Sequence, residues 1–215
     1  MTTTENIQQA LRGLVSDDAS VRLRAALAMG TSPDPGFVET LVARCAVEPD
    51  FPVREMLTWA LLRQSPTLTV PLLVAELRSP IARARSQALH TLSKIGDRSA
   101  WPAITRELLT DSDDEVARTA WRAAVALAPE GAEPALAAVL ATQLGRGGRE
   151  VRLSLSRAMI ALGEAVVPVL DAARRHSDPE VRAHLGATER LRADPEAGFD
   201  LAVEEAKRVV ALGPS

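Results

Sequence analysis

The sequence has no tyrosine, a single cysteine and few aromatic residues, and each shortage excludes a class of protein. Aromatic side chains make up 3% of the chain, which disfavours β-sheets because strands are enriched in aromatic and β-branched residues. The lone Cys45 excludes an internal disulfide bond and a cysteine-based metal cluster, and it indicates a reducing compartment. No stretch approaches the roughly 20 apolar residues that span a bilayer, and the amino terminus lacks a signal-peptide pattern. We expect a soluble, cytoplasmic protein.

What the chain does contain favours closely packed helices. Hydrophobic residues make up 47% of its 215 residues, with alanine and leucine the most prominent, and alanine is the best helix former. This length suits one large domain or two small ones. The net charge of -3 argues against nucleic-acid or anionic-membrane binding through bulk electrostatics, so such a role would need a local basic patch.

A unit of about 32 residues is repeated six times. The stretch DDASVRLRAALAMG at residues 17–30 shows its pattern: an aspartate, a valine followed by arginine, and an alanine-rich run. Successive copies are 32, 31, 32, 35 and 30 residues apart, and the longest interval contains the loop sequence GRGGR. The apolar residues that anchor the alignment are Val21, Val53, Ala84, Val116, Val151 and Val181. A fixed period of this size predicts a helical repeat protein.

Each anchor is expected to lie in a helix that begins at a capping residue. An aspartate stands three positions before the anchor in four copies, where its carboxylate can accept hydrogen bonds from the free amides of the first turn. Those aspartates are Asp18, Asp50, Asp113 and Asp178. Small or apolar residues four positions after each anchor predict one buried helix face. Their positions are Ala25, Leu57, Ala88, Ala120, Leu155 and Leu185.

A second apolar stripe precedes each of these helices and predicts a partner helix, as Trp101, Ile104 and Leu108 do in the fourth copy. We expect a single domain over residues 1–215: six helical hairpins in an all-α, right-handed solenoid. A final helix, Phe199 to Leu212 within residues 195–215, is expected to cap the open end of the stack.

The repeated pattern D-x-x-V-R-x-x-A-x-x-A-L, with KIGD at residues 94–97 opening the next pair, resembles the HEAT repeat, especially the short bacterial type related to phycobilisome lyase repeats. The resemblance covers nearly the whole chain and implies an α-solenoid. It leaves function open, because the family includes scaffolds, bilin lyases and, more distantly, DNA glycosylases. The third copy departs from the pattern at Ile81, where the aspartate is missing, and the fourth at Ala117, where the arginine is missing.

The arginines that follow the anchors are expected to be structural, bonding between adjacent turns of the stack rather than to a ligand. They are Arg22, Arg54, Arg85, Arg152 and Arg182. The lone Cys45 falls on an apolar stripe and is expected to be a core residue. The three histidines lack metal-ligand spacing, and GRGGRE at residues 145–150 lacks the ending of a phosphate-binding loop. We expect no metal site, no cofactor and no catalytic residue.

The candidate working surface is the outward face of the second helices, which we expect to line the concave side of the solenoid. Offsets of two, three, six and ten residues from each anchor are predicted to point away from the core. In copies two to five these positions hold five basic residues and one acidic residue. The candidate partner-binding residues are Met56, Trp59, Arg63, His90, Lys94, Arg118, Arg122 and Arg157. They are predicted to form one continuous patch with Trp59 as its anchor, whereas the alternative is a solvated face without a partner.

The preferred function is a noncatalytic scaffold or adaptor, with a regulatory role, that binds an acidic or amphipathic protein segment. The chain itself is expected to be bacterial, and a monomer or weak oligomer. One alternative is an alkylpurine-type DNA glycosylase, for which Trp59, Trp121, Arg122 and Arg157 are superficially suitable. The low pI of about 5.7 opposes that reading, and Trp121 is predicted to face the core. The other alternative is a bilin lyase.

Overall fold

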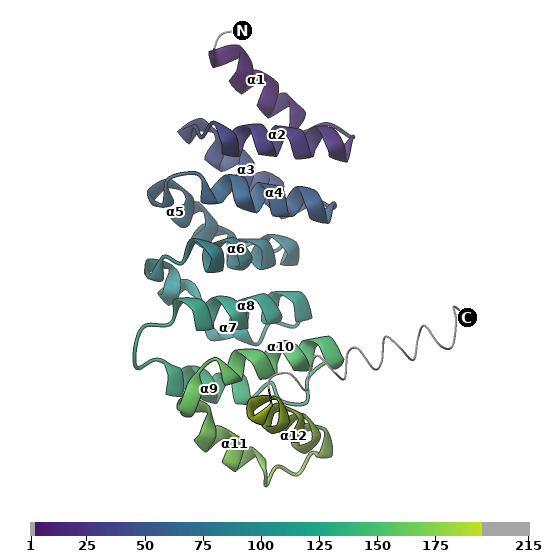
Figure 1. The fold of residues 1–215 in the computed structure, drawn as a ribbon, viewed down its shortest axis with the longest axis vertical. Helices are drawn as coiled ribbons and strands as arrows, with labels where there is room; N and C mark the ends of the chain where they lie inside the picture. Colours follow the sequence, from purple (N-terminus) through teal and green to yellow (C-terminus); the bar gives the residue numbers. More distant parts are fainter. Residues whose placement is uncertain (1–2, 195–215) are drawn as a thin grey trace, which may run out of the picture. The chain divides into compact units, whose positions relative to one another are not determined.

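The computed structural model describes residues 3–194, and over this range the chain is an all-α repeat fold without a strand (Figure 1). The chain divides into two compact units, Met1–Pro129 and Glu130–Ser215, and each is described by itself. The predicted C-terminal cap, residues 195–215, lies outside the described residues.

The predicted hairpins are present as six successive pairs of helices within residues 3–194. The first unit contains α1 (Thr3–Gly13) with α2 (Ala19–Thr31), α3 (Val38–Val47) with α4 (Phe51–Leu62), α5 (Pro66–Glu76) with α6 (Ala82–Ile95), and α7 (Arg106–Leu109) with α8 (Asp114–Leu127). The second unit contains α9 (Glu133–Ala141) with α10 (Arg149–Ile160), and α11 (Val167–Ala173) with α12 (Pro179–Ala193). Short 3-10 turns, η1 (Pro35–Phe37), η2 (Arg98–Ala103) and η3 (Gly163–Val166), precede α3, α7 and α11.

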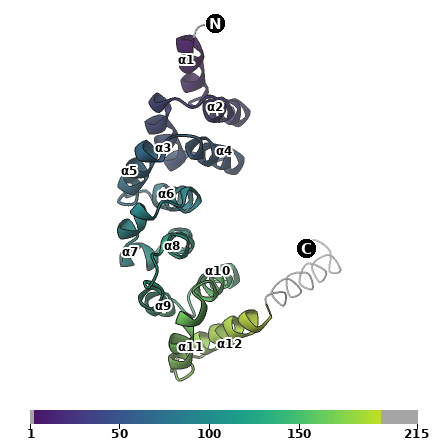
Figure 2. The same cartoon turned by 60° about the vertical axis from the view of Figure 1, so that its left-hand side comes forward.

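The helices of the first unit form two layers, which Figure 2 shows end on. The second helices α2, α4, α6 and α8 pack side by side in one layer, and α3, α5 and α7 lie behind them. Within the first unit, the predicted working surface therefore belongs to a continuous layer of helices.

The predicted caps and core positions are confirmed. The carboxylates of Asp18, Asp50, Asp113 and Asp178 each accept at least one amide hydrogen bond at the start of α2, α4, α8 and α12. Ile81 stands at the N-cap of α6, and because its side chain has no hydrogen-bond acceptor, this helix starts without a side-chain cap. All six residues four positions after the anchors are buried, whereas the anchor Val21 is only half-buried. The side chain of Trp121 is fully buried, as predicted.

The predicted first helix of the fourth pair is interrupted. Its stripe of Trp101, Ile104 and Leu108 spans η2 and the short α7 rather than one helix. Pro102 has no amide hydrogen to donate to an α-helix, and Ile104 and Thr105 have ψ values of 85° and 167°, outside the helical range. The apolar spacing was correct for burial of Ile104 and Leu108 but did not predict the break.

The arginine after each anchor ties its helix to the loop that precedes it. Arg22 donates to the carbonyls of Ser16 and Asp17 at 2.9 and 2.8 Å, and Arg85 donates to that of Ser79 at 2.9 Å. Arg54, Arg152 and Arg182 make the same kind of bond. We call these five side chains the loop tethers. Their bonds to carbonyls show that all five contribute to the fold, and because a guanidinium group has five N–H donors, such a bond leaves room for a further partner.

The fourth pair lacks this arginine, since Ala117 occupies its position, and a tryptophan takes over the contact. The indole Nε1 of Trp121 donates to the carbonyl of Leu109 at 2.8 Å, which joins α8 to the chain before it. This hydrogen bond explains why a tryptophan is buried here, which the spacing of apolar residues alone did not predict.

Candidate functional site

The predicted partner-binding residues are on, or at the end of, second helices in both units. Met56 and Trp59 lie on α4 and Arg63 follows its last residue; His90 and Lys94 lie on α6, and Arg118 and Arg122 on α8. Arg157 lies on α10, in the second unit, and is therefore considered separately from the other seven. Arg63, Lys94, Arg122 and Arg157 are exposed, whereas Met56, His90 and Arg118 are half-buried.

The side chains three residues after the anchor do not point outward in every repeat. Gln87 and Thr119 occupy this position on α6 and α8, and both are buried. Gln87 donates to the hydroxyl of Thr58 on α4 at 3.1 Å, so this position faces the neighbouring second helix. The prediction for offset three was therefore wrong at these two positions, because a layer of parallel helices buries the flanks as well as the back of each helix.

Trp59 is the predicted anchor, and its side chain is partly built into the fold. It is 37% exposed, and its six-membered ring lies against Gly30 of α2. A Cβ atom at residue 30 would lie 2.2 Å from the ring, so only glycine leaves room for this packing. One edge of the indole remains available to a partner, and the rest fixes α2 against α4.

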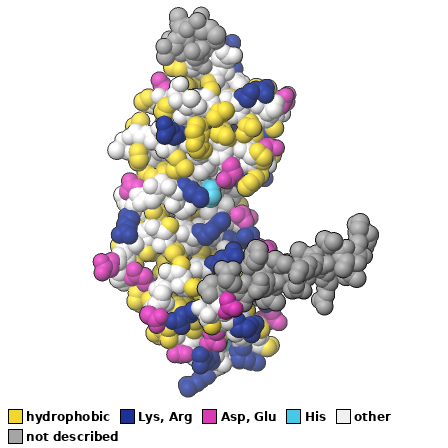
Figure 3. Space-filling model, in the orientation of Figure 1, with side chains coloured by type: hydrophobic (Ala, Val, Ile, Leu, Met, Phe, Trp, Pro, Cys, Tyr) yellow, Lys and Arg dark blue, Asp and Glu magenta, His cyan; other side chains and the backbone are white. Residues whose placement is uncertain are grey.

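An acidic side chain outside the predicted offsets, Glu115, neutralises part of the basic charge on this face. Glu115, in the first turn of α8, lies 3.3 Å from the guanidinium of Arg118 and 3.9 Å from that of Arg122. Figure 3 shows the result as mixed dark blue and magenta side chains over α6 and α8, next to yellow side chains gathered over α2 and α4. Among the residues described on this face, Arg63 and Lys94 are not held by such an ion pair.

His90 adds no formal charge to this face at neutral pH. Burial lowers the pKa of its imidazole, and the neighbouring Arg122 and Lys94 lower it further, although Glu55 opposes them. Its Nε2 atom lies 3.5 Å from the carboxylate of Glu55, too far for a good hydrogen bond, and has no other partner in the described part of the chain. His90 is therefore a neutral, weakly held group.

A hollow of about 950 Å³ lies along the first halves of α4, α6 and α8. Of the predicted residues it includes His90 and Arg122, and it leaves out Trp59 and the others. Three of its lining side chains are large, apolar and exposed: Val47 (52%), Phe51 (62%) and Ile81 (47%). Sequence reasoning missed these three because Phe51 and Ile81 stand at the helix starts and Val47 at the end of α3, which the helical offsets did not sample.

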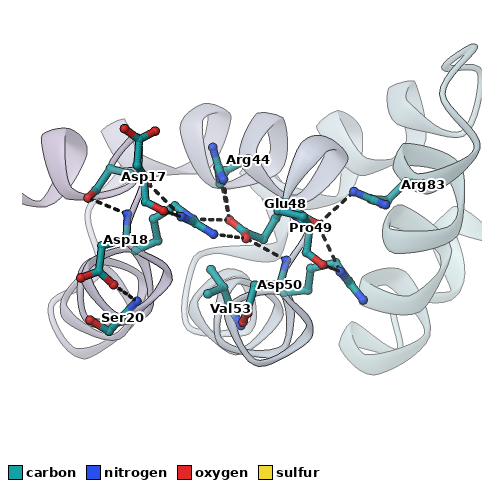
Figure 4. Close-up of polar contacts among 12 residues, drawn as sticks. Asp17, Asp18, Ser20, Arg44, Glu48, Pro49, Asp50, Val53 and Arg83 are labelled. Atoms are coloured by element: carbon teal, nitrogen blue, oxygen red, sulfur yellow. Dashed lines mark hydrogen bonds and ion pairs between the residues drawn. The ribbon is translucent and has the colours of Figure 1, made fainter.

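A buried glutamate beside this hollow gathers several arginines. The side chain of Glu48 is 0% exposed, and its carboxylate accepts hydrogen bonds from Arg22, Arg44 and the amide of Asp50 (Figure 4). Burial alone would raise the pKa of this carboxyl, but the bonds from Arg22, Asp50 and Arg44 outweigh it and lower the pKa to about 2. The sequence carried a sign of this: Glu48 follows Cys45 by three residues on an apolar stripe, four after Arg44.

The remaining candidate chemistry is structural. Cys45 is buried as predicted, and burial raises the pKa of its thiol to about 12, which keeps it protonated. In residues 3–194 no group of three histidine, cysteine or acidic side chains is arranged to hold a metal ion. The same part of the chain has no helix that is both long and apolar enough to cross a membrane.

Comparison with known proteins agrees with this geometry. Residues 49–126, which span α4 to α8 except for the last residue of α8, match the family model for HEAT repeats. No curated protein matches the chain. Among solved structures, the complex of CpcE and CpcF of phycocyanin lyase from Nostoc sp. PCC7120 is similar at 22% identity and a TM-score of 0.50, covering 83% of this chain and 74% of that one. An engineered protein is similar at 22% identity and a TM-score of 0.48, covering 87% of this chain and 96% of its own.

The likeness to the phycocyanin lyase complex, at 22% identity, supports the fold alone. The family match shows HEAT repeats over residues 49–126, and helix pairs of the same kind come before and after this stretch.

Proposed function

We propose that this protein is a noncatalytic scaffold that binds a segment of another protein on the face formed by α4, α6 and α8. The observation that carries the proposal is the hollow on this face, which collects three exposed apolar side chains, Val47, Phe51 and Ile81. Exposed apolar groups gathered in one concave place are typical of protein interaction sites, whereas scattered ones need no explanation. HEAT repeats are typical of protein-interaction scaffolds, and this use of the fold requires no catalytic group.

The proposed partner segment is amphipathic and carries acidic residues. Lys94 and Arg63 are exposed on the same layer of helices, outside the ion pairs that Glu115 makes with Arg118 and Arg122. Apolar side chains of the partner would fill the hollow, and some of its carboxylates would meet these cations beyond the hollow, at the C-terminal ends of α4 and α6. Arginine and aromatic side chains are the residues that contribute most in such interfaces.

The glycosylase and lyase alternatives gain no support from particular residues. Trp121, one of the two tryptophans in the glycosylase hypothesis, is fully buried and bonded to the carbonyl of Leu109. Arg122 lies next to Glu115, which would repel a phosphate backbone. The likeness to phycocyanin lyase supports the fold and no step of bilin chemistry.

Site-specific photocrosslinking in the native host tests the scaffold proposal. A benzophenone side chain placed at Glu55, which lines the hollow, should give discrete adducts with one or a few proteins. The matched control places it at Arg106, an exposed residue of α7 in the other layer of helices. Adding Phe51→Ser should weaken the adducts at position 55. Equal adduct yields at both positions, or a yield at position 55 that Phe51→Ser does not change, would contradict the proposal.

A further inference from the structure

Two guanidinium groups from neighbouring repeats converge on one backbone oxygen at the edge of the hollow. Nη1 of Arg54, on α4, lies 3.2 Å from the carbonyl oxygen of Glu48 and 2.7 Å from that of Pro49. Nη1 of Arg83, on α6, lies 3.4 Å from the same Glu48 oxygen (Figure 4). Both side chains also line the hollow.

No carboxylate neutralises this pair. The side chain of Glu48 is already taken by Arg22 and Arg44, and that of Asp50 accepts the amide of Val53 at the start of α4. Across the described residues, neither Arg54 nor Arg83 forms an ion pair with an acidic side chain, whereas the loop tethers Arg22, Arg85 and Arg152 do. Two like charges held close together favour an anion between them, and a carboxylate can accept from two guanidinium groups at once.

The surroundings of these arginines are apolar. The guanidinium carbon of Arg54 lies over the exposed Phe51 ring, 5.6 Å from its centre, within the range of a cation–π contact. Ile81, Phe51 and Val47 flank it with exposed apolar surface. A ligand that fits must therefore present a carboxylate and an apolar side chain within a few ångströms of each other.

The other end of the hollow has the opposite charge. Asp113 and Glu115 line it at the start of α8, and the single base there, Arg122, lies 3.9 Å from Glu115, so the acids outnumber the bases by one. A second carboxylate would be repelled there, so the hollow distinguishes the two directions of a bound segment.

We propose that Arg54 and Arg83 form a receptor for one carboxylate of a partner peptide, with the apolar neighbour of that carboxylate seated on Phe51 and Ile81. The inference rests on the proposed function and specifies the chemistry of its partner: an aspartate, glutamate or chain-terminal carboxylate next to a leucine, isoleucine, valine or phenylalanine. The residues that follow it toward α8 are neutral or basic.

Selection from a random 12-residue peptide library displayed on phage tests this chemistry with the full-length protein. Enriched peptides should share an acidic residue adjacent to a large apolar one. Synthetic copies of the most enriched peptide, labelled with fluorescein, then give dissociation constants by anisotropy. A version with the acidic residue replaced by its amide should bind at least about fivefold more weakly, because a charge-assisted hydrogen bond is lost.

The protein variants are chosen to keep the fold intact. Arg83→Gln removes an exposed guanidinium with one long backbone contact, and it should weaken the peptide about fivefold. Phe51→Ser should weaken it by a similar factor through lost apolar contact. The matched control is Arg98→Gln, an exposed arginine on η2, which should leave the affinity unchanged. Circular dichroism of each variant checks that the helices remain.

The outcomes separate this inference from the scaffold proposal. Peptides that bind the α4–α6–α8 face without an acidic–apolar pair, or that bind Arg83→Gln as tightly as the original chain, overturn the receptor and leave the scaffold standing. A library that yields no binder overturns the receptor, and the photocrosslinking experiment then decides the scaffold independently. A dimer in light scattering that Phe51→Ser dissociates would show that a second copy of the chain fills the hollow, which also overturns the inference.

Discussion

Arg22 and Glu48 form a two-point ion pair between the first and second repeats. Nε and Nη2 of Arg22 lie 2.8 and 2.7 Å from the two carboxylate oxygens of Glu48, and both side chains are buried. Arg85 and Asp111 make the corresponding pair between the third and fourth repeats, with the same separation of 26 residues along the chain. Some loop tethers therefore have two roles: they bond the loop of their own repeat and an acid of the next.

Breaking the Arg22–Glu48 pair from one side should be costly. In Arg22→Met, the buried Glu48 carboxylate retains Arg44 and the Asp50 amide but loses both hydrogen bonds from Arg22. We expect a loss of about 3 kcal/mol in the free energy of unfolding, measured by urea denaturation. The double variant Arg22→Met, Glu48→Met should lose less than the single one, because no buried charge is left uncompensated. A double variant as unstable as the sum of the two single ones would contradict this.

The same carboxylate should make stability depend on acid pH. The folded pKa of Glu48 is about 2, below its ordinary value of 4.5, so the unfolded chain binds its proton more readily. The stabilisation from this group is therefore complete above about pH 4.5 and is lost as the pH falls through about 2. Urea midpoints between pH 5 and pH 2.5 should fall more steeply for the original chain than for Glu48→Gln. Parallel profiles would argue against the low pKa.

Gly30→Ala should destabilise the first unit although alanine is the better helix former. Gly30 is inside α2, where alanine would normally gain up to about 1 kcal/mol. Here the added methyl group would lie 2.2 Å from the Trp59 ring and 2.9 Å from the Cα atom of Ala60. We expect a net loss of about 1–3 kcal/mol from overpacking, with a changed tryptophan emission spectrum. The double variant Gly30→Ala, Trp59→Leu should be less affected by the methyl group.

His184 should give the second unit its own pH dependence. Its Nδ1 accepts the amide of Gly145 at 3.0 Å, and its Nε2 lies 2.9 Å from the carbonyl oxygen of Arg152, so the neutral ring satisfies both. Burial lowers its pKa from the ordinary 6.5 and outweighs the hydrogen bond to the Arg152 carbonyl, which raises it; the Arg152 charge lowers the pKa further. Stability from this group is complete above about pH 6.5 and falls as the pH drops toward the lowered pKa.

The check is the melting temperature of the original chain and of His184→Gln at pH 7.5 and pH 5.5. The variant should be less stable at pH 7.5 and should lose less on acidification. A variant that follows the same pH profile as the original chain would show that His184 is not the titrating group.

The sequence predicted the parts of the structure that depend on periodicity. Three predictions rest on features that recur in several copies of the repeat. They are the helix starts at Asp18 and Asp113, the burial of Ala88 and Leu155, and the structural role of Arg22. Each copy is a separate example of the same feature, which makes the prediction stronger. The break at Pro102 and the packing of Gly30 on Trp59 occur once each. They depend on the fit of particular side chains across helices, which a helical wheel does not contain.

The candidate surface was predicted less completely, because the residues at the start of each second helix were not considered. Offsets counted from the anchors sampled the middle of each second helix and missed the acids and apolar groups at its start. Glu115 changes the charge around Arg118 and Arg122, and Phe51 and Ile81 supply the apolar part of the hollow. Spacing along the sequence predicts on which face of its helix a side chain lies. It does not predict which side chains of the neighbouring helix that residue contacts.

The loop tethers have a consequence for how such a chain can change in length. In the fifth repeat, Arg152 reaches the carbonyls of Gly145 and Gly147, two glycines with φ of 85° and 67°, across the loop that makes this interval the longest. A flexible side chain rather than a fixed turn joins the loop to the helix, so extra residues can be absorbed there while the helix keeps its place in the core. We therefore expect insertions at these loops to be tolerated without disturbing the layers of helices.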